Sequence, residues 1–193
     1  DKLELVENLL DKADKIIIGG GMAFTFVKAL NQGIGKCQVE EDLLETARSV
    51  MEKAKAKGVK LYLPVDCVCA AGPKETGQVV VRTIQEIPPD LMGLDIGPAS
   101  AQLFSVALSG CGTIVWNGPM GVFEVKEFAA GTMTVAKAVA SSTGLTIVGG
   151  GDTDAALHKS GLADKVSFVS TAGGAFLEML GGRELPGVAV LEK

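Results

Sequence analysis

Residues 16–22 read Ile16-Ile17-Ile18-Gly19-Gly20-Gly21-Met22, a run of β-branched residues followed at once by three glycines. A short run that is apolar at every position predicts a strand buried on both faces, as the strands of a parallel sheet are. Helical spacing of apolar residues lies on either side, over residues 3–13 and 22–30. The stretch therefore predicts a helix, a buried strand, a glycine turn and a second helix in succession.

The rest of the sequence repeats this alternation. Further helices are expected over residues 41–57, 98–108, 126–140, 152–161 and 174–180, strands over residues 59–63, 79–81, 113–116, 145–148 and 166–169, and a surface loop over residues 71–78. Alternating helices and buried strands predict an α/β fold of three layers, α/β/α, around a mainly parallel sheet of about six strands. No internal boundary divides residues 1–193. Ligands of such folds bind beyond the carboxyl ends of the strands.

The charge of the chain limits its partners. The formal net charge is -5 and the pI is about 5.0, and the basic residues are scattered. Nucleic acids and anionic membranes are bound through clustered Lys and Arg, so we expect neither as a partner. Residues 96–123 carry no formal charge, but prolines and glycines interrupt them, so this stretch is not expected to span a membrane.

The four cysteines, Cys37, Cys67, Cys69 and Cys111, have neither CxxC spacing nor a set of histidines nearby. This pattern disfavours a zinc site or a redox dithiol and indicates reduced, mostly buried thiols. No signal peptide opens the chain, which starts at Asp1 and not at a methionine. We therefore expect a fragment of a cytoplasmic protein.

Two more glycine-rich turns follow predicted strands: Gly149-Gly150-Gly151-Asp152 and Ala172-Gly173-Gly174. Glycine lets the backbone approach a ligand closely, and the free N–H groups of the following helix attract phosphate. None of the turns matches the P-loop or the dinucleotide fingerprint. A single glycine turn is better explained by tight packing of helix on strand, but three such turns together reverse this preference and favour an anionic, phosphorylated ligand.

Asp152 is the side chain best placed to bind a metal, because a carboxylate beside a phosphate-binding turn can hold Mg²⁺. The alternative is that Asp152 is a helix N-cap and that Thr153 begins the helix. His158 is the only histidine and has no nucleophile motif near it. The lack of an acid–base constellation disfavours hydrolases but is compatible with phosphoryl transfer, which depends on positioning and charge neutralisation.

Several segments together resemble phosphoglycerate kinases in order and spacing. They are residues 17–26 (Ile-Ile-Gly-Gly-Gly-Met-Ala-Phe-Thr-Phe), 63–66 (Leu-Pro-Val-Asp), 93–98 (Gly-Leu-Asp-Ile-Gly-Pro), 115–124 (Val-Trp-Asn-Gly-Pro-Met-Gly-Val-Phe-Glu), 149–153, 170–171 and 184–188. The resemblance covers essentially all of the chain. It implies the C-terminal, nucleotide-binding domain of that family, Rossmann-like in fold, with the N-terminal domain that binds 3-phosphoglycerate absent.

The resemblance also implies roles for individual residues. Adenine would be bound by Gly20, Gly21, Gly93 and Leu94, the ribose and its surroundings by Asn117, Pro119 and Glu124, and Mg²⁺ by Asp152. The phosphates of ADP or ATP would be bound by Gly150, Thr153, Thr171 and Gly173, with Lys2, Gly151 and Gly174 at the transferring phosphoryl group.

The family transfers a phosphoryl group between 1,3-bisphosphoglycerate and ADP, which requires two domains. The resemblance thus implies a monomeric chain that binds nucleotide with negligible turnover. Three positions depart from the family pattern: Phe168 replaces a histidine, Ala172 a glycine and Phe176 a small polar residue. Ala172 does not easily adopt a positive φ, which puts the third turn in doubt. Two alternatives stay open, a catalytically inactive nucleotide-binding module and a structural domain without nucleotide.

Overall fold

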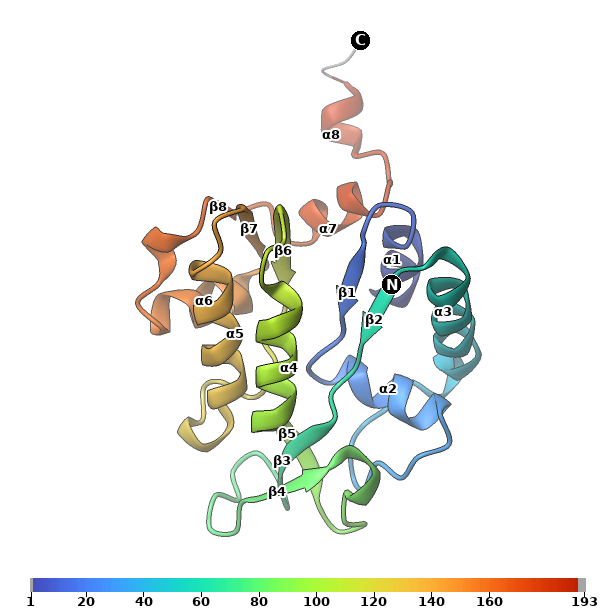
Figure 1. The fold of residues 1–193 in the computed structure, drawn as a ribbon, viewed down its shortest axis with the longest axis vertical. Helices are drawn as coiled ribbons and strands as arrows, with labels where there is room; N and C mark the ends of the chain where they lie inside the picture. Colours follow the sequence, from blue (N-terminus) through green and yellow to red (C-terminus); the bar gives the residue numbers. More distant parts are fainter. Residues whose placement is uncertain (1, 191–193) are drawn as a thin grey trace.

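The computed structural model describes residues 2–190 and shows a mixed α/β fold (Figure 1). Its helices are α1 (Lys2–Leu9), α2 (Met22–Ala29), α3 (Leu44–Lys57), α4 (Pro98–Leu108), α5 (Ala130–Ala140), α6 (Gly151–Lys159), α7 (Gly174–Leu180) and α8 (Pro186–Ala189). Its strands are β1 (Lys15–Ile17), β2 (Lys60–Tyr62), β3 (Asp66–Ala70), β4 (Val80–Thr83), β5 (Met92–Ile96), β6 (Thr113–Asn117), β7 (Leu145–Gly149) and β8 (Phe168–Ser170). Short 3₁₀ turns lie at Glu41–Leu43, Ile84–Glu86, Lys126–Phe128 and Ala163–Lys165.

The strands form three separate sheets in the described part of the chain. β1 pairs with β2, and β7 pairs with β6 on one side and β8 on the other, all in parallel, whereas β4, β3 and β5 form an antiparallel sheet in that order. The parallel α/β character is confirmed, but the expectation of one sheet of about six strands is not. The antiparallel sheet was missed because β3 and β5 lie in motifs whose Gly, Pro and Asp residues obscured a strand pattern.

Several element ends follow local chemistry. α3 ends at Gly58, whose φ of 71° is the left-handed conformation that glycine adopts at low cost. α4 begins at Pro98, where the missing N–H of proline is not needed. The helix expected over residues 41–57 starts with a 3₁₀ turn before α3, and the helix expected over residues 126–140 does the same before α5.

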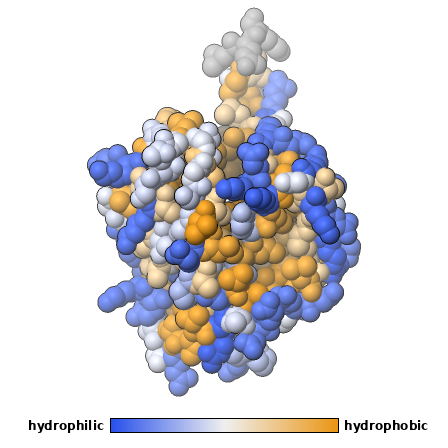
Figure 2. All heavy atoms as spheres, viewed as in Figure 1, coloured by the Kyte–Doolittle hydropathy of each residue, from blue (hydrophilic) through white to orange (hydrophobic). Residues whose placement is uncertain are grey.

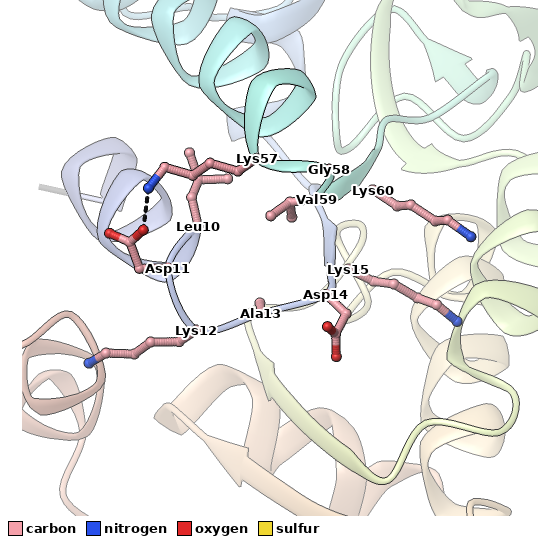
Figure 3. A pocket seen from close by; sticks show the side chains of 10 residues that line it. All are labelled: Leu10, Asp11, Lys12, Ala13, Asp14, Lys15, Lys57, Gly58, Val59 and Lys60. Atoms are coloured by element: carbon pink, nitrogen blue, oxygen red, sulfur yellow. Dashed lines mark hydrogen bonds and ion pairs between the residues drawn. The ribbon is translucent and has the colours of Figure 1, made fainter.

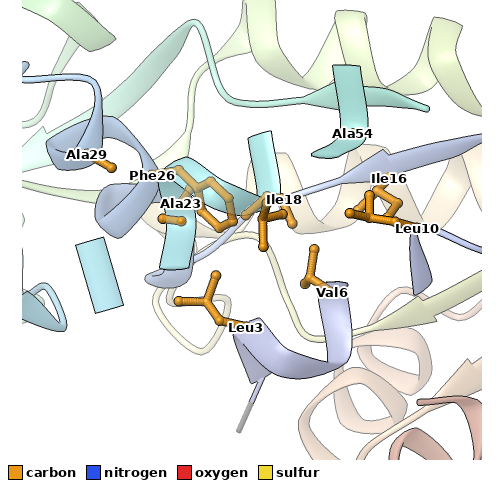
Figure 4. Close-up of a cluster of buried hydrophobic side chains, with 11 residues drawn as sticks. Leu3, Val6, Leu10, Ile16, Ile18, Ala23, Phe26, Ala29 and Ala54 are labelled. Carbon is orange, nitrogen blue, oxygen red and sulfur yellow. The ribbon is translucent and has the colours of Figure 1, made fainter. Parts of the chain in front are cut away.

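Two large apolar clusters hold these elements together. The first joins α1, α2 and α3 to the strand β1, and its residues include Leu3, Val6, Ile18, Phe26 and Ala54 (Figure 4). Phe26 is fully buried there, so truncating it to alanine would cost about 3–5 kcal/mol of stability. The expected helices 3–13 and 22–30 thus enclose the strand that they flank in the sequence.

The second cluster packs α4, α5 and α6 against β6 and β7, with Phe104, Trp116, Val148 and Leu157 among its buried residues. Ile17 and Tyr62, from β1 and β2, pack against its edge. The Lys15 ammonium also donates a hydrogen bond of 2.8 Å to the Ala107 carbonyl oxygen at the end of α4. The two parallel sheets are therefore joined by side-chain packing and not by a continuous hydrogen-bonded ladder.

The surface in the orientation of Figure 2 exposes apolar atoms across its middle, with hydrophilic residues mainly around the edge. Within residues 2–190, none of the helices combines the length and the apolar character that crossing a membrane requires. Cys37, Cys67 and Cys69 are buried, Cys111 is partly exposed and all four are free thiols, as expected.

Candidate functional site

The glycine-rich turns begin where parallel strands end. Residues 19–21 follow β1, residues 149–151 follow β7 and residues 172–174 follow β8. The register of the β6–β7–β8 sheet places Asn117 beside Gly149, and Gly149 beside Ser170. The second and third turns and the loop that follows β6 therefore leave the same edge of one parallel sheet, which is where α/β folds bind ligands.

The loop after β6, residues 117–121, also contacts the first glycine turn. A Cβ atom added to Gly19 would overlap the Met120 side chain, so the two segments touch without space for another atom. Gly20 has a φ of 63°, and a Cβ atom there would lie 3.0 Å from the Pro119 carbonyl oxygen. Position 20 therefore requires glycine both for its backbone conformation and because the Pro119 carbonyl oxygen lies so close.

The same loop is tied to the second turn by a hydrogen bond. The Gly118 N–H donates to the Thr153 hydroxyl oxygen over 2.7 Å, and the Thr153 side chain is almost completely buried. A Cβ atom on Gly150 would lie 2.8 Å from the Asn117 amide nitrogen. Residues 117–121 therefore connect the turns after β1 and β7.

Helix α6 begins at Gly151, and its N-cap is Gly150, with a φ of 93°. The alternative in which Asp152 is the N-cap and Thr153 begins the helix is therefore wrong. Asp152 lies in the first helical turn with its carboxylate exposed, where the partial positive charge of the helix start favours an anion. A glycine can take the cap because only it adopts this left-handed geometry easily.

The third turn takes its positive φ at Gly173, where φ is 56°. Ala172 is not among the positive-φ residues, and its N–H donates to the Ser170 hydroxyl oxygen over 3.3 Å. Replacing the family's glycine by Ala172 therefore causes no backbone strain, contrary to the doubt raised from the sequence. Phe168 has 58% of its surface exposed on β8, and Phe176 is buried on α7.

The residues expected around adenine lie on two elements. Gly21 is the exposed N-cap of α2, and Gly93 lies in β5, where an added Cβ atom would meet the Phe24 ring of α2. The Gly93 N–H donates to the Cys37 sulfur over 3.1 Å. Leu94 is only 8% exposed and packs with Phe128, so little of its side chain is available to a ligand.

Two other residues predicted to belong to the site, Glu124 and Lys2, are less closely connected to the glycine turns. Glu124 is exposed, and its backbone is held by Lys159, whose ammonium donates to the carbonyl oxygens of Phe123 (2.7 Å) and Glu124 (3.3 Å). Lys2 is the exposed first residue of α1. The contacts found among residues 2–190 do not join Lys2 to the glycine turns.

The residues around Asp152 can be tested for their fit to Mg²⁺. The described residues contain no group of three or more His, Cys, Asp or Glu side chains arranged to hold a metal. Magnesium differs from zinc in that it commonly takes one or two carboxylates and completes its shell with water and substrate phosphates. An exposed carboxylate beside a glycine turn at the start of a helix fits that pattern, so Asp152 is compatible with a magnesium that arrives with a nucleotide.

Four buried polar residues support the site and were given no role from the sequence. Thr132 accepts hydrogen bonds from the N–H groups of Met120 (3.0 Å) and Gly121 (3.2 Å), which fixes the loop after β6 onto α5. At the start of α4, the backbone N–H and the hydroxyl of Ser100 both donate hydrogen bonds to the Asp66 carboxylate. Nothing in a single sequence marks these residues, because their tertiary partners lie 11 to 36 positions away.

Asp95 is the fourth of these buried residues. Its carboxylate accepts hydrogen bonds from the N–H groups of Ile96 (2.9 Å) and Gly131 (2.7 Å), so it joins β5 to the start of α5. Burial raises the pKa of this carboxyl from 3.8 to about 7, although the two backbone hydrogen bonds act in the opposite direction. The group therefore changes its charge near neutral pH.

A cavity of about 340 Å³ lies at the opposite ends of β1 and β2, between residues 10–15 and 57–60 (Figure 3). Four of its residues are lysines, and three of these ammonium groups already have partners. Lys12 donates to the Leu180 carbonyl oxygen, Lys15 to that of Ala107, and Lys57 pairs with Asp11. Figure 3 shows these side chains directed away from the centre of the cavity, so it offers no built anion site.

Comparison with known proteins identifies the family. The family model described as phosphoglycerate kinase matches residues 1–183. The chain is 60% identical over 191 residues to a phosphoglycerate kinase of Geotalea uraniireducens and 58% identical over 192 residues to one of Geobacter metallireducens, covering 99% and 100% of this chain and 48% of each relative. It thus spans about half the length of these curated relatives.

The fold agrees with solved structures. A phosphoglycerate kinase structure from Coxiella burnetii superimposes with a TM-score of 0.94 at 48% identity, covering 98% of this chain and 49% of the other. One from Pyrococcus horikoshii superimposes with a TM-score of 0.83 at 32% identity, covering 98% of this chain and 48% of the other. Because the family model and both kinds of relative match nearly the whole sequence, this chain belongs to the phosphoglycerate kinase family.

Proposed function

We propose that this chain is the C-terminal, nucleotide-binding domain of a phosphoglycerate kinase and that it binds Mg·ADP or Mg·ATP at the glycine-rich turns. The observation that carries the proposal is the convergence of segments on residues 117–121, which touch the first turn through Met120 and Pro119 and the second through Thr153. Such an edge of a parallel sheet suits a phosphorylated ligand. Membership of the family supports adenine nucleotide as that ligand.

The base and the sugar would be bound near the first turn. Gly20 and Gly21 expose backbone where a flat base can approach closely. Gly93 lies against the Phe24 ring of α2, and Leu94 follows it in β5. Asn117, Pro119 and Glu124, on the loop that joins the first and second turns, would contact the ribose. The ligand would then lie along residues 117–124.

The phosphates would be bound at the second and third turns. The backbone amides of Gly150 and Gly151 begin α6, whose partial positive charge favours anions. Thr171, Gly173 and Gly174 would contribute from the third turn. Thr153 is buried and accepts the Gly118 N–H, so we assign it the role of holding the loop in place and not direct contact with phosphate.

Asp152 would hold Mg²⁺ beside these phosphates, directly or through water. The ion, when bound, neutralises charge on the phosphate oxygens during transfer. Asp152 contributes an exposed carboxylate without a hydrogen-bonding partner among residues 2–190. Its place in the first turn of α6 keeps this charge next to Gly150 and Gly151.

The complete enzyme would transfer a phosphoryl group from the acyl phosphate of 1,3-bisphosphoglycerate to a β-phosphate oxygen of ADP, giving 3-phosphoglycerate and ATP. The P–O bond to the carboxylate breaks as the new P–O bond forms. Lys2 would stabilise the charge of the transferring group, with the amides of Gly151 and Gly174. The phosphoglycerate site would lie on an N-terminal domain, so the 193-residue chain alone is expected to have negligible turnover.

Calorimetric titration of the chain with ADP, with and without Mg²⁺, tests this proposal. We expect binding that magnesium strengthens, and we expect Asp152→Ala to remove the magnesium effect while binding of ADP alone persists. Asp164→Ala is the matched control, because Asp164 is also an exposed aspartate, on the turn after α6.

Three results would count against the proposal. An absence of heat with either form of ADP would exclude nucleotide binding, and a magnesium effect that survives Asp152→Ala would exclude the metal assignment. Rapid phosphoryl transfer from Mg·ATP to 3-phosphoglycerate by the isolated chain would contradict the need for a second domain.

A further inference from the structure

The ring of Phe176, in the first turns of α7, lies directly on Gly149 at the end of β7. A Cβ atom placed on Gly149 would overlap the Phe176 ring, with the Cε1 atom 2.8 Å away, and would lie 3.5 Å from the Asn117 amide nitrogen. Phe176 is 9% exposed and Gly149 is buried. The ring therefore covers the backbone just before the second glycine turn.

Helix α7 is held at both ends, and Phe176 supplies one of the two anchors. At the last residue of α7, Lys12 donates to the Leu180 carbonyl oxygen over 2.8 Å, and just beyond the helix Arg183 pairs with Glu4 of α1 over 3.1 Å. At the other end, the contact between Phe176 and Gly149 joins α7 to the β6–β7–β8 sheet. Without the ring, α7 would keep its contacts to α1 but lose this connection to the sheet.

The contact also limits the freedom of the second turn. Gly150, next to Gly149, has a φ of 93° and a conformation that is accessible only to glycine at low cost. Such a turn has no side chain of its own to hold it in place. The Phe176 ring and the Asn117 amide both lie against the turn at Gly149, and the Asn117 amide also lies against Gly150.

We propose that Phe176 is a positioning residue: its ring holds the Gly149–Gly150 turn in the conformation that receives the nucleotide phosphates. This inference rests on the proposed function and deepens it. Phe176 touches the turn and not the ligand, so its effect is confined to the phosphate end of the nucleotide. The adenine end, near Gly20 and Gly93, is held by other contacts.

The first test compares ADP with adenosine. We expect Phe176→Ala to weaken binding of Mg·ADP about tenfold, as loss of a group that orients a binding group typically does, and to leave adenosine binding unchanged. Phe176→Leu keeps an apolar side chain and should restore part of the ADP affinity. Met179→Ala is the control, because Met179 lies on the same helix with 51% of its surface exposed. Circular dichroism checks that each variant is folded.

The second test uses the steric relation between the two residues. Gly149 does not have a positive φ, so alanine is compatible with its backbone, and only the Phe176 ring stands in the way of the new methyl group. Gly149→Ala should therefore weaken ADP binding and lower the midpoint of urea unfolding in the parent chain. In the Phe176→Ala background, Gly149→Ala should have little further effect on either quantity, because the two changes act on one contact.

The outcomes separate this inference from the proposed function. Equal loss of ADP and adenosine affinity in Phe176→Ala, or additive effects of the two substitutions, would overturn the positioning role while nucleotide binding stands. If the parent chain binds neither ADP nor adenosine, the proposed function fails and the positioning role fails with it, even where the unfolding midpoints show that the two residues are in contact.

Discussion

The Thr153 hydroxyl oxygen accepts a hydrogen bond of 2.7 Å from the Gly118 N–H, across 35 positions of sequence. This bond joins the first turn of α6 to the loop after β6. That loop also touches the first glycine turn at Gly19 and Gly20. The Thr153–Gly118 hydrogen bond therefore helps to fix the spacing between the proposed adenine and phosphate ends of the site.

Thr153→Val tests this connection. Valine has nearly the same shape but no acceptor, so the Gly118 N–H would lose its partner, at a cost of about 1–3 kcal/mol in the free energy of unfolding. Thr153→Ser keeps the acceptor and should cost less. Thr134→Val is the control, because the Thr134 hydroxyl donates only to the Ala130 carbonyl of its own helix. Equal losses for Thr153→Val and Thr134→Val in urea unfolding would contradict the role of the bond.

Asp66 should stabilise the start of α4 from a distant strand. Its carboxylate accepts the N–H groups of Ala99 (3.0 Å) and Ser100 (2.8 Å) and the Ser100 hydroxyl (2.6 Å), whereas the N-cap residue Gly97 has no side chain to do so. Asp66→Ala leaves these donors without an acceptor and should lower the free energy of unfolding by about 2–4 kcal/mol, because hydrogen bonds to charged groups are stronger than those between neutral groups.

Asp66→Asn retains one carbonyl acceptor and should lose less stability than Asp66→Ala. Urea unfolding of the two variants measures the difference. Destabilisation of equal size in both would show that the carboxylate contributes packing only and does not cap α4.

Asp95 should make stability fall as the pH rises towards neutrality. Its pKa is raised by burial from 3.8 to about 7, so between these values the folded chain binds more protons than the unfolded chain. The stabilisation is complete below pH 3.8 and is lost as the pH passes through about 7. A shift of this size corresponds to at most about 4 kcal/mol.

Asp95→Asn removes the titration and provides the comparison. The free energy of unfolding of the parent minus that of Asp95→Asn should decrease between about pH 5 and pH 8, because other ionisable groups contribute equally to both chains. Urea unfolding at several pH values gives this difference. A difference that stays constant or increases with pH would contradict the prediction.

Gly20→Ala and Gly21→Ala should differ although the two glycines are adjacent. Gly20 has a φ of 63° and lies close to the Pro119 carbonyl oxygen, so alanine there should cost about 1–2 kcal/mol of stability. Gly21 is in the right-handed helical region, and a Cβ atom there would meet nothing within 4 Å. Gly21→Ala should therefore be neutral or slightly stabilising in thermal unfolding. Similar losses of stability in both variants would contradict the different backbone conformations assigned to Gly20 and Gly21.

The sequence was informative wherever the controlling interactions are local. The β-branched run before Gly19 predicted a buried strand, Pro98 predicted the start of a helix and Gly58 predicted the end of one, and each prediction was confirmed. Close agreement of several segments with phosphoglycerate kinases also identified the family before the structure was considered. These signals depend on residues within one turn or one strand of each other.

Interactions between distant segments were decided only by the tertiary structure. The strands around Cys67 and Gly93 pair in an antiparallel sheet, and no local pattern distinguishes that from a parallel arrangement. Asp152 proved to lie inside α6 and not at its cap, because the backbone of Gly150 takes a conformation that no spacing rule indicates.

The three glycine turns show the same division. Their composition and their place after buried strands determined that they could bind phosphate, since that depends on backbone freedom and on the start of a helix. That residues 117–121 join two of them, and that Phe176 covers Gly149, depends on side chains from segments far apart in the chain. Such contacts are fixed by packing in three dimensions, so only the tertiary structure decided how the turns lie relative to one another.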